Sequence, residues 1–517
     1  MTKIFLYGPS GSGKSTSGKL LAESLGISAI DLDTAIEEQT GKGIPAIFQS
    51  EGEVGFRRVE GEVLGKLVKG EQECIIMLGG GTLLQKANRD LVEAAGPVIC
   101  LRANQETLLQ RLNQDPNKRP LLGQNILANL QALIRERGSL YDSFGWQLDT
   151  SQLTPEATVH ELQVDLGRFT IRGMGADYPV RIKAGSLDQL GEHLRAINMK
   201  GPIALVGDGN TAHLYGQRAK DSLQHSGYEV SLLEIPAGEE HKTLATVNEL
   251  WQGFLRAGLE RGSTVVALGG GVVGDLAGFA AATYLRGVAW VNVPTTLLAM
   301  VDSSLGGKTG ADLPQGKNLI GAFHSPQLVL ADPELLRTLP IREVRNGMAE
   351  TIKHGIIADP ALYALCQKTD LQSLHKNDAL IRRSVGVKAR VIVADPYEKG
   401  LRETLNFGHT IGHGVEKASA YRISHGEAVA IGMVVETRLA EKIGLARVGL
   451  AEAISETMRQ NGLPTSIPAD LERDQILAAM QLDKKRAAGK IRFALPEDIG
   501  KVRSGVIIEN WQELLDL

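Results

Sequence analysis

Cysteine is scarce in this sequence, and no two of its three cysteines, Cys74, Cys100 and Cys366, form a CxxC pair. Isolated thiols provide neither a disulfide framework nor a cysteine metal site, and they suit a reducing compartment. The formal net charge of -4 argues against a broad basic surface for nucleic acid, but it allows a local cationic pocket for a small anion. We therefore expect small-molecule partners and no nucleic acid.

Long apolar runs are also missing. The longest uncharged stretch, residues 287–301, is too short for a membrane span and contains Pro294. The first residues, KIFLYG after Met1 and Thr2, lack the basic and apolar segments of a signal peptide. These features predict a soluble, cytoplasmic protein with no membrane partner.

The length of 517 residues exceeds what one hydrophobic core usually supports. Up to residue 335, short β-branched runs that end in glycine clusters alternate with amphipathic helix patterns, which is typical of parallel α/β sheets. Segments beyond that point, such as 428–445, repeat apolar residues at helical spacing. The pattern also breaks near residues 166–176, where a new sheet is expected to begin. We therefore predict three domains, 1–166, 167–335 and 336–517.

The segment GPSGSGKST, residues 8–16, follows an apolar strand and precedes a helix pattern, which is the context that a P-loop requires. Glycines let backbone N–H groups face a phosphate, Lys14 reaches the β- and γ-phosphates, and Ser15 coordinates Mg²⁺. The sequence therefore predicts an ATP site with Mg²⁺. Its expected contacts are Gly11, Gly13, Lys14, Ser15 and Thr16.

The phosphate acceptor must be inferred from residues further along the chain. Asp31 and Asp33 fall at the end of the second predicted strand, where one carboxylate can orient an alcohol and the other Mg²⁺ or its water. Arg57 in FRRVE, the glycines of LGGGT at 78–82 and Arg119 in NKRPLL follow in order. Singly, each has an ordinary interpretation as a surface arginine or a glycine turn.

Together behind the P-loop, these motifs resemble shikimate kinase over about residues 1–165. The resemblance implies that Asp33 orients the 3-hydroxyl of shikimate and that Arg119 is a lid arginine that meets the phosphates. It places Arg111 near the adenine. It assigns the shikimate carboxylate and ring to Arg57, Gly79, Gly80 and Gly81.

One position departs from the family pattern. Where the family is expected to have an arginine after LY that pairs with the substrate carboxylate, this chain has Asp142. A carboxylate facing a carboxylate is repulsive, so we expect weakened shikimate binding with ATP binding retained. The competing interpretation is that Arg137, one helix turn away, replaces the missing cation and Asp142 pairs with it. A nucleotide-binding module without shikimate turnover is the alternative for this half.

A second nucleotide site is indicated in the next part of the chain. Gly269, Gly271 and Gly274 satisfy GxGxxG after a predicted strand and before a helix, as dinucleotide binding requires. The usual downstream acidic residue is absent, since no acidic residue lies between Asp275 and Asp302. Asp208, which follows an earlier strand, is the expected ribose contact instead.

Three of the eleven histidines, His409, His413 and His425, lie within residues 405–427. His409 and His413 are four residues apart on a predicted helix, so both can face one ion, and a histidine-only site with His425 is the simplest geometric interpretation. Core histidines without a ligand role are the alternative.

The segments around these features strongly resemble 3-dehydroquinate synthase from about residue 170 to the end. The motifs, in order, are VPTTLLAMVDSSLGGKTGADLPQGKNLIGAF, EVRNGMAETIKHG, GLRETLNFGHTIGH and ISHGEAVAIGM. The whole chain thus resembles a shikimate kinase–dehydroquinate synthase fusion. The expected architecture is a P-loop kinase domain with a parallel sheet, then an α/β NAD-binding domain, then a mostly helical metal-binding domain.

The resemblance selects a different metal trio, Glu350, His409 and His425, for Zn²⁺ or Co²⁺, and leaves His413 to relay a proton. Asp302 joins the catalytic group, and either Lys484 or Lys485 enters the site. Arg286 reaches the substrate from a neighbouring subunit of a homodimer. The remaining implied contacts are Lys388, Arg402 and Asn406 for the substrate carboxylate; Lys308, Asn318, Lys353 and His413 for its phosphate; and Asp208, Asn210, Glu239, Lys242, Gly270, Gly271, Val272, Val273, Gly274, Asp275, Thr295, Thr296, Lys308 and Lys317 for NAD.

The implied substrate is 3-deoxy-arabino-heptulosonate 7-phosphate. Its oxidation by NAD⁺ at C5 acidifies the adjacent C–H, phosphate leaves by β-elimination, the hydride returns, and an aldol step closes the ring. Glycerol-dehydrogenase-like metal alcohol dehydrogenases and other sugar phosphate cyclases are the alternatives. A simple polyol needs no cationic clamp such as Lys353, Lys388 and Arg402, which argues against the first.

Overall fold

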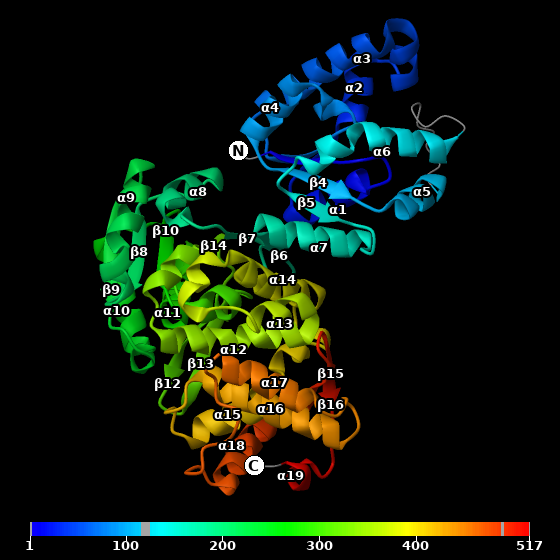
Figure 1. The fold of residues 1–517 in the computed structure, drawn as a ribbon. Coiled ribbons are helices and arrows are strands. Elements are labelled where there is room, and N and C mark those ends of the chain that lie inside the picture. Colours follow the sequence, from blue (N-terminus) through cyan, green and yellow to red (C-terminus); the bar gives the residue numbers. More distant parts are fainter. Residues whose placement is uncertain (1–2, 115–124, 487–490, 516–517) are drawn as a thin grey trace. The chain divides into compact units, whose positions relative to one another are not determined.

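The computed structural model describes residues 3–114, 125–486 and 491–515, the side chains of 481–486 excepted. The chain forms two compact units, Met1–Leu166 and Gly167–Leu517 (Figure 1). Within the described residues, no helix is long and apolar enough to cross a membrane. All three cysteines are buried free thiols.

The first unit contains a five-stranded sheet in the order β2-β3-β1-β4-β5, with every pairing parallel. Strands β1 and β3 are buried along their whole length, which explains their continuous apolar sequences. The strands are β1 Ile4–Tyr7, β2 Ser28–Asp31, β3 Cys74–Met77, β4 Val98–Arg102 and β5 Gln147–Asp149. The helices are α1 Lys14–Leu25, α2 Leu32–Thr40, α3 Ile44–Lys69, α4 Lys86–Ala95, α5 Gln105–Gln114, α6 Ile126–Asp142 and α7 Pro155–Leu166.

The second unit begins with a seven-stranded sheet in the order β6-β7-β14-β11-β10-β8-β9. Only the β6–β7 pairing is antiparallel among its described ladders. The strands are β6 Arg168–Ile171, β7 Tyr178–Ile182, β8 Ile203–Asp208, β9 Val230–Ile235, β10 Thr264–Gly269, β11 Ala289–Pro294 and β14 Leu328–Ala331. The helices of this region are α8 Leu190–Ala196, α9 Gln217–His225, α10 Leu244–Arg256 and α11 Gly271–Thr283. A separate hairpin consists of β12 Lys308–Leu313 and β13 Gly316–Phe323.

Helices dominate after β14, as the apolar spacing predicts, so the expected α/β class with a helical C-terminal region is confirmed. Helices α15 and α16 approach closely because glycines face the contact: a Cβ on Gly432 would lie 1.9 Å from the Gly408 carbonyl oxygen. The elements are α12 Ile341–Ala358, α13 Pro360–Cys366, α14 Asp378–Ala394, α15 His409–Ala418, α16 His425–Lys442, α17 Leu450–Gln460, α18 Arg473–Arg486, β15 Phe493–Asp498, β16 Lys501–Val506 and α19 Trp511–Leu514.

One buried carboxylate joins two parts of this second unit. Asp332, directly after β14, is fully buried and accepts hydrogen bonds from the backbone N–H groups of Gly185 at 2.9 Å and Leu187 at 3.0 Å. It also accepts one from Glu334 N at 3.1 Å. The carboxylate therefore anchors the turn after β7 to the end of β14.

Replacing Asp332 with Ala should lower the free energy of unfolding by about 2 to 4 kcal/mol, because buried N–H groups lose their acceptor. Urea unfolding followed by tryptophan fluorescence in a Trp146→Phe background measures this, since the other tryptophans lie in the second unit. Asp395 is the matched control: it also accepts three backbone N–H groups but is partly exposed, so Asp395→Ala should cost less. Equal losses would contradict the prediction.

Candidate active sites

The P-loop follows β1 and ends at the first turn of α1. Gly11 and Gly13 have φ of +85° and +91°, in the left-handed region that favours glycine. Lys14 begins the helix, and its Nζ donates to the carbonyl oxygens of Gly8 and Pro9, both at 2.9 Å. The backbone N–H groups at the start of α1, including Ser15 and Thr16, provide the phosphate-binding helix end that the sequence predicts.

The two aspartates after β2 occupy different elements. Asp31 is the last strand residue and accepts a hydrogen bond from Ser15 Oγ at 2.8 Å, which brings together the two groups expected around Mg²⁺. Asp33 lies in the first turn of α2, so the expectation that both aspartates end the strand is wrong. Asp31 caps this helix through the N–H of Asp33 at 3.1 Å.

The glycine turn after β3 gathers the predicted acceptor-binding groups. A Cβ on Gly79 would lie 3.4 Å from Asp33 Oδ1, and one on Gly81 would lie 2.5 Å from Arg57 Nη2 and 3.2 Å from Arg137 Nη1. The Gly80 carbonyl oxygen accepts a hydrogen bond from Tyr141 Oη at 3.0 Å. A side chain at this turn would therefore collide with the two guanidinium groups, and its absence leaves room for a small acid.

Both arginines at this turn are held in place. Arg57 Nη1 donates to Glu60 Oε2 at 2.7 Å, and the fully buried Glu60 also accepts from Thr82 Oγ1 at 2.6 Å. Arg137 is buried, at 6% exposure, and hydrogen-bonds with Tyr141. Two converging guanidinium groups suit a carboxylate, which they can bind through paired N–H donors.

The expectation that Asp142 faces the acceptor carboxylate is wrong in this structure. The Asp142 side chain is 64% exposed and pairs with Arg102 at the end of β4. Arg137 lies at the glycine turn instead, as the competing interpretation proposes, although Asp142 pairs with Arg102 and not with Arg137. The acceptor side therefore keeps a cation, which is Arg137 and not a residue at position 142.

Two further arginines are predicted to contact ATP. Arg111 borders the P-loop: its Nη1 lies 3.9 Å from a Cβ placed on Gly13, and its Nη2 donates to the Thr150 carbonyl oxygen at 2.7 Å. Arg119 lies outside the described residues. Arg111 therefore remains the arginine that the structure brings to the nucleotide side.

Replacing Arg137 with Ala should raise the KM for shikimate at least about tenfold, since a charge-assisted contact is worth about 1.5 to 3 kcal/mol. Asp142→Ala should change this KM little, because its partner is Arg102. Steady-state kinetics with the KM for ATP as control test both. A large effect of Asp142→Ala with none of Arg137→Ala would reverse the assignment.

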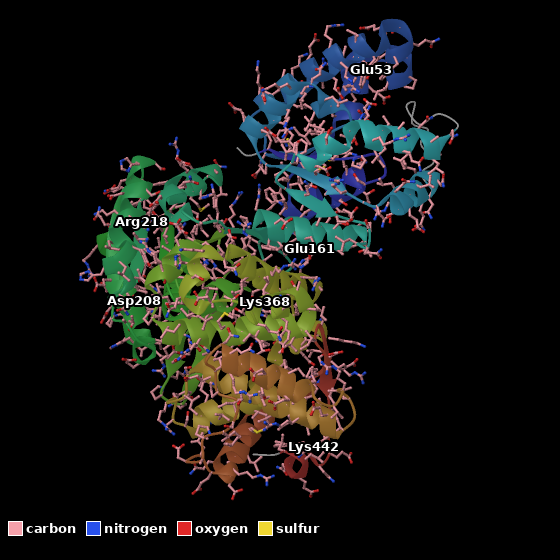
Figure 2. The ribbon with its side chains drawn as sticks, in the orientation of Figure 1. Glu53, Glu161, Asp208, Arg218, Lys368 and Lys442 are labelled. Atoms are coloured by element: carbon pink, nitrogen blue, oxygen red, sulfur yellow. The ribbon has the colours of Figure 1, made fainter. Side chains whose placement is uncertain are left out.

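The predicted NAD site lies at the carboxyl ends of neighbouring parallel strands. Gly269 ends β10 and α11 begins at Gly271. Asp208, labelled in Figure 2, ends the adjacent β8. Asp208 Oδ1 accepts from the N–H of Asn210 at 3.1 Å, which orders the turn after the strand. Thr295 N donates to the Gly269 carbonyl oxygen at 3.0 Å. The structure therefore brings these predicted contacts to one edge of the sheet.

Lysines from two segments border this edge. Lys242 is buried, and its Nζ lies 2.6 Å from both Asp275 Oδ2 and Asn318 Oδ1. Asn318 thus lies with predicted NAD contacts, whereas the resemblance groups it with the phosphate contacts. Lys317 Nζ lies 3.7 Å from Glu239 and 3.0 Å from Glu416. Lys317 of the β12–β13 hairpin and Glu239, which follows β9, are both predicted NAD contacts, and they lie close together.

Glu350, His409 and His425 come together from three helices. Each offers one ligand atom, and these atoms all lie within 4.8 Å of one another. Glu350 on α12 is fully buried, and its Oε1 lies 3.6 Å from His409 Nε2 and 3.5 Å from His425 Nε2. Among the described residues, neither Glu350 oxygen has a hydrogen-bond partner, although Oε2 meets the Lys353 ammonium. Two imidazoles and a buried carboxylate are the donor set that zinc prefers.

The surroundings prepare these ligands electrostatically. Burial opposes ionisation of Glu350, but Lys353 and the histidines hold its pKa well below the usual range. Burial and Lys353 lower the pKa of His409, which favours the neutral imidazole that binds metals. Burial opposes the charged form of His425, but the Glu350 and Glu416 carboxylates, each 3.5 Å from one of its ring nitrogens, raise its pKa to about 9. A cation among these groups would take the place of that proton.

His413 lies beside this trio but is not grouped with Glu350. It is exposed, and its ring centroid is 5.2 Å from that of His409 and 6.2 Å from that of His425. It belongs to a second grouping, His413, Glu416 and His425, that meets the same distance limit. We favour the first trio because His425 Nδ1 faces Glu416 at 3.5 Å, which leaves Nε2 for Glu350 and an ion.

Three predicted substrate-binding cations, Lys388, Arg402 and Lys308, differ in burial and in their partners. Lys388 is buried, and its Nζ donates to Asp302 Oδ1 at 2.5 Å and to the Asp302 carbonyl oxygen at 2.7 Å. Burial lowers the pKa of Lys388 even though Asp302 opposes the shift. Arg402 is buried and donates to the Pro396 carbonyl oxygen at 2.6 Å. Lys308 is more than half exposed and lies 3.7 Å from Glu398.

The remaining predicted substrate contacts are Asn406 and a lysine at position 484 or 485. Asn406 is exposed at the end of the short helix Leu401–Asn406. The side chains of Lys484 and Lys485 lie outside the described residues. Sequence reasoning missed Glu416, although it lies one turn after His413 on the same helix. It also missed His354, a buried residue one turn after Glu350 whose Nδ1 lies 2.7 Å from Ser384 Oγ.

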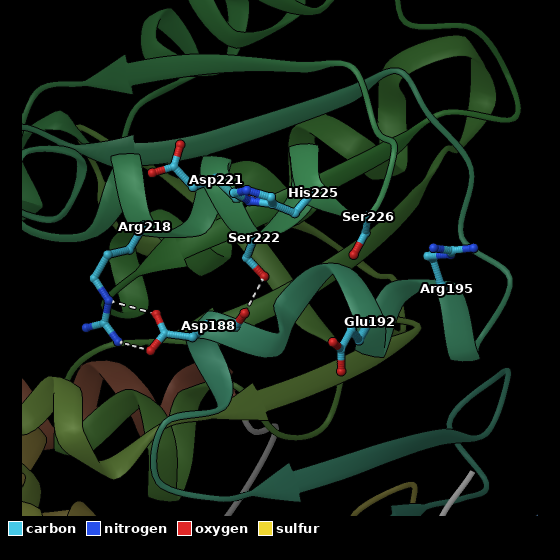
Figure 3. A pocket seen from close by; sticks show the side chains of 8 residues that line it. All are labelled: Asp188, Glu192, Arg195, Arg218, Asp221, Ser222, His225 and Ser226. Atoms are coloured by element: carbon cyan, nitrogen blue, oxygen red, sulfur yellow. Dashed lines mark hydrogen bonds and ion pairs between the residues drawn. The ribbon is translucent and has the colours of Figure 1, made fainter.

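Figure 3 shows a pocket of about 390 Å³ that includes no predicted site residue. Arg218 Nε and Nη2 donate to the two Asp188 oxygens at 3.0 and 2.9 Å, and Ser222 Oγ donates to the Asp188 carbonyl oxygen at 2.9 Å. Because these groups satisfy one another, we assign the pocket no part in catalysis. Its lining is Asp188, Glu192, Arg195, Arg218, Asp221, Ser222, His225 and Ser226.

Removing a ligand should weaken metal binding, so His409→Ala should raise the Kd for Co²⁺ or Zn²⁺ at least about a hundredfold, because three protein ligands share the ion. His413→Ala should raise it less than about threefold if His413 lies outside the ligand set. Competition with a chromophoric chelator measures both constants. An equal rise in Kd for the two variants would instead assign the ion to a site that includes His413.

The fold and sites define a P-loop phosphotransferase joined to an NAD- and metal-dependent enzyme. Residues 10–166 match the shikimate kinase family model, 232–346 match 3-dehydroquinate synthase N-terminal, and 347–486 match 3-dehydroquinate synthase C-terminal. The chain is 47% identical over 332 residues to the 3-dehydroquinate synthase of Nostoc punctiforme, which covers 63% of this chain and 92% of that protein. The chain belongs to the 3-dehydroquinate synthase family and carries a shikimate kinase domain before it.

Two solved structures are similar to the second unit. One is a 2-epi-5-epi-valiolone synthase from Streptomyces hygroscopicus subsp. jinggangensis with NAD⁺ and Zn²⁺, at 30% identity and a TM-score of 0.60, over 66% of this chain and 95% of that one. The other is a 2-deoxy-scyllo-inosose synthase with carbaglucose-6-phosphate, NAD⁺ and Co²⁺, at 28% identity and 0.60, over 67% and 95%. The likeness supports an NAD- and metal-binding architecture.

Proposed function

We propose that the chain is a bifunctional shikimate-pathway enzyme. Its first unit transfers phosphate from ATP to the 3-hydroxyl of shikimate, and its second unit cyclises 3-deoxy-arabino-heptulosonate 7-phosphate to 3-dehydroquinate with release of phosphate. The observation that carries the second activity is the convergence of Glu350, His409 and His425 beside buried lysines. The family matches over both parts of the chain support the pair of activities.

In the kinase, the chain's own groups bind and orient the reactants. Mg²⁺ with ATP supplies the phosphoryl group when bound, with Ser15 and Asp31 on the metal side. Asp33 orients the acceptor hydroxyl at the Gly79 turn, while Arg57 and Arg137 bind the carboxylate. Lys14 stabilises the charge that develops on the transferring phosphate.

In the synthase, residues of the second unit would hold the two anionic ends of the substrate. NAD⁺ accepts and returns a hydride when bound, and Zn²⁺ or Co²⁺ lowers the pKa of a substrate hydroxyl. Lys388, Arg402 and Asn406 bind the carboxylate, and Lys308 and Lys353 bind the phosphate. His413, outside the ligand trio, moves a proton during elimination. Asp302 holds Lys388 in position, as their 2.5 Å contact supports.

Two related activities are the alternatives for the second unit. Other sugar phosphate cyclases share the architecture, but the chain is 47% identical to a 3-dehydroquinate synthase and 30% to a valiolone synthase. A glycerol-dehydrogenase-like enzyme would release NADH and would have no use for the buried lysines. Mass spectrometry of products from each heptulose phosphate separates these cases.

We further propose that the enzyme works in the cytoplasm as a homodimer through the synthase half. The family resemblance, in which Arg286 completes the neighbour's site, motivates the dimer. Exposed Leu285 and Arg286 have left-handed φ of 50° and 67°, strain that functional segments often retain. Within this half, residues 167–335 would bind NAD and 336–517 the metal.

Replacing Lys14 with Ala should separate the two activities. Shikimate phosphorylation should fall at least about a hundredfold, because Lys14 stabilises the transferring phosphoryl group, while 3-dehydroquinate formation should persist. Product identification by mass spectrometry on the intact chain measures both. Removing the synthase metal with a chelator should have the opposite effect. Dehydroquinate formation should be lost, and shikimate phosphorylation should persist once Mg²⁺ is added back for the kinase assay. A folded Lys14→Ala protein that makes no dehydroquinate would contradict the two-site proposal.

A further inference from the structure

One buried carboxylate near the metal trio has no role in the proposed chemistry. Glu436 lies on α16 and is 0% exposed. Its Oε2 accepts a hydrogen bond from the N–H of Gly408 at 2.7 Å, and its Oε1 accepts one from the N–H of Ile411 at 3.1 Å. The N–H of Thr410 also points to this carboxylate. Glu436 therefore binds the start of α15, the helix whose first residue is His409.

The start of α15 needs an acceptor from another helix. The first N–H groups of a helix have no partner within it, and they usually find one on the side chain of the preceding residue. That residue here is Gly408, with φ of +81°, which has no side chain to offer. A capping side chain would not fit at this position either, because a Cβ on Gly408 would lie 2.5 Å from the Met433 side chain. Glu436 fills this requirement across the helix contact.

The two histidine ligands are held in different ways. His425 faces Glu416 through Nδ1, and a capping box of Ser424 and Glu427 orders its helix start. His409 Nδ1 lies 3.3 Å from the Phe407 carbonyl oxygen, a contact within its own turn. The direction of the His409 ring therefore follows the backbone at 407–411, which Glu436 holds.

We propose that Glu436 is a positioning residue for the metal site, which fixes His409 relative to Glu350 and His425 by binding the first turn of α15. The inference rests on the proposed ligand role of His409. Both carboxylate oxygens are needed, because each accepts a different N–H group. Glu436 acts on the ion only through His409 and does not enter the coordination sphere.

The test compares Co²⁺ affinity in the full chain among Glu436→Gln, Glu436→Leu and the wild type, by chelator competition, together with the visible spectrum of bound Co²⁺. Leucine removes both acceptors and should raise the Kd at least about tenfold, the usual range for residues that orient a ligand. Glutamine keeps one acceptor and should cause a smaller rise. The cobalt spectrum should change in the same order.

The matched control is Thr437→Ala. Thr437 is the neighbouring buried residue, and its Oγ1 donates to the Met433 carbonyl oxygen within α16 at 2.6 Å. The substitution should lower the urea midpoint while leaving the Kd and the cobalt spectrum unchanged, and kinase activity in each sample reports an intact chain. If Glu436→Leu does not fold, Glu436→Asp, which keeps the charge but is one methylene shorter, replaces it with the same expected rise.

The outcomes separate this inference from the metal site itself. A folded Glu436→Leu protein with wild-type Kd and spectrum overturns the role of Glu436, provided that His409→Ala weakens binding. A His409→Ala protein that binds Co²⁺ as the wild type does overturns the ligand assignment, and the inference with it. A rise in Kd for Thr437→Ala as large as that for Glu436→Leu also overturns it, because general destabilisation would then explain both.

Discussion

The buried charge of Glu350 is the constraint around which the second unit is organised. An isolated carboxylate removed from water is costly, so it must be neutralised or paired. Lys353 and two imidazoles supply the pairing, and neither oxygen finds a hydrogen bond among the described residues. The carboxylate and the two imidazoles that converge here are donors suited to a divalent cation. A metal ion at the predicted site and the Lys353 ammonium would thus both balance the charge of the Glu350 carboxylate.

Helix starts position the ligands of this site. His409 and His425 are the first residues of α15 and α16, so both rings are set by backbone that leaves a loop and enters a helix. Glycines along the contact let the two helices approach until backbone meets backbone. Close approach buries the N–H groups of the first turn, and Glu436 becomes necessary as their acceptor. The geometry of the two histidines therefore depends on how closely α15 and α16 pack. Replacing one of the contact glycines with a larger residue would push these helices apart.

The sequence predicts what is local and leaves open what is brought together by the fold. Strand and helix alternation predicts both sheets, and the spacing of His409 and His413 predicts their shared helix. Spacing alone favours a histidine-only site, because nothing in it shows that Glu350, on a distant helix, fills the third position. The error at Asp142 has the same origin: a position beside LY was taken for the clamp, whereas Arg137, one turn earlier, is the side chain that α6 directs at the Gly81 turn.

The two units place different cations at the sites where anions are predicted to bind, and the chemistry of the cations accounts for the difference. The kinase turn uses Arg57 and Arg137, whose planar guanidinium groups keep their charge and match a carboxylate through paired donors. The predicted synthase pocket contains Lys353 and Lys388, compact ammonium groups that are buried beside acids. Burial lowers the pKa of Lys388, so its charge depends on Asp302. A guanidinium, whose charge is fixed, suits a carboxylate that keeps its charge throughout the reaction. An ammonium paired with a carboxylate can change its protonation, which suits a substrate whose charge distribution changes as phosphate leaves.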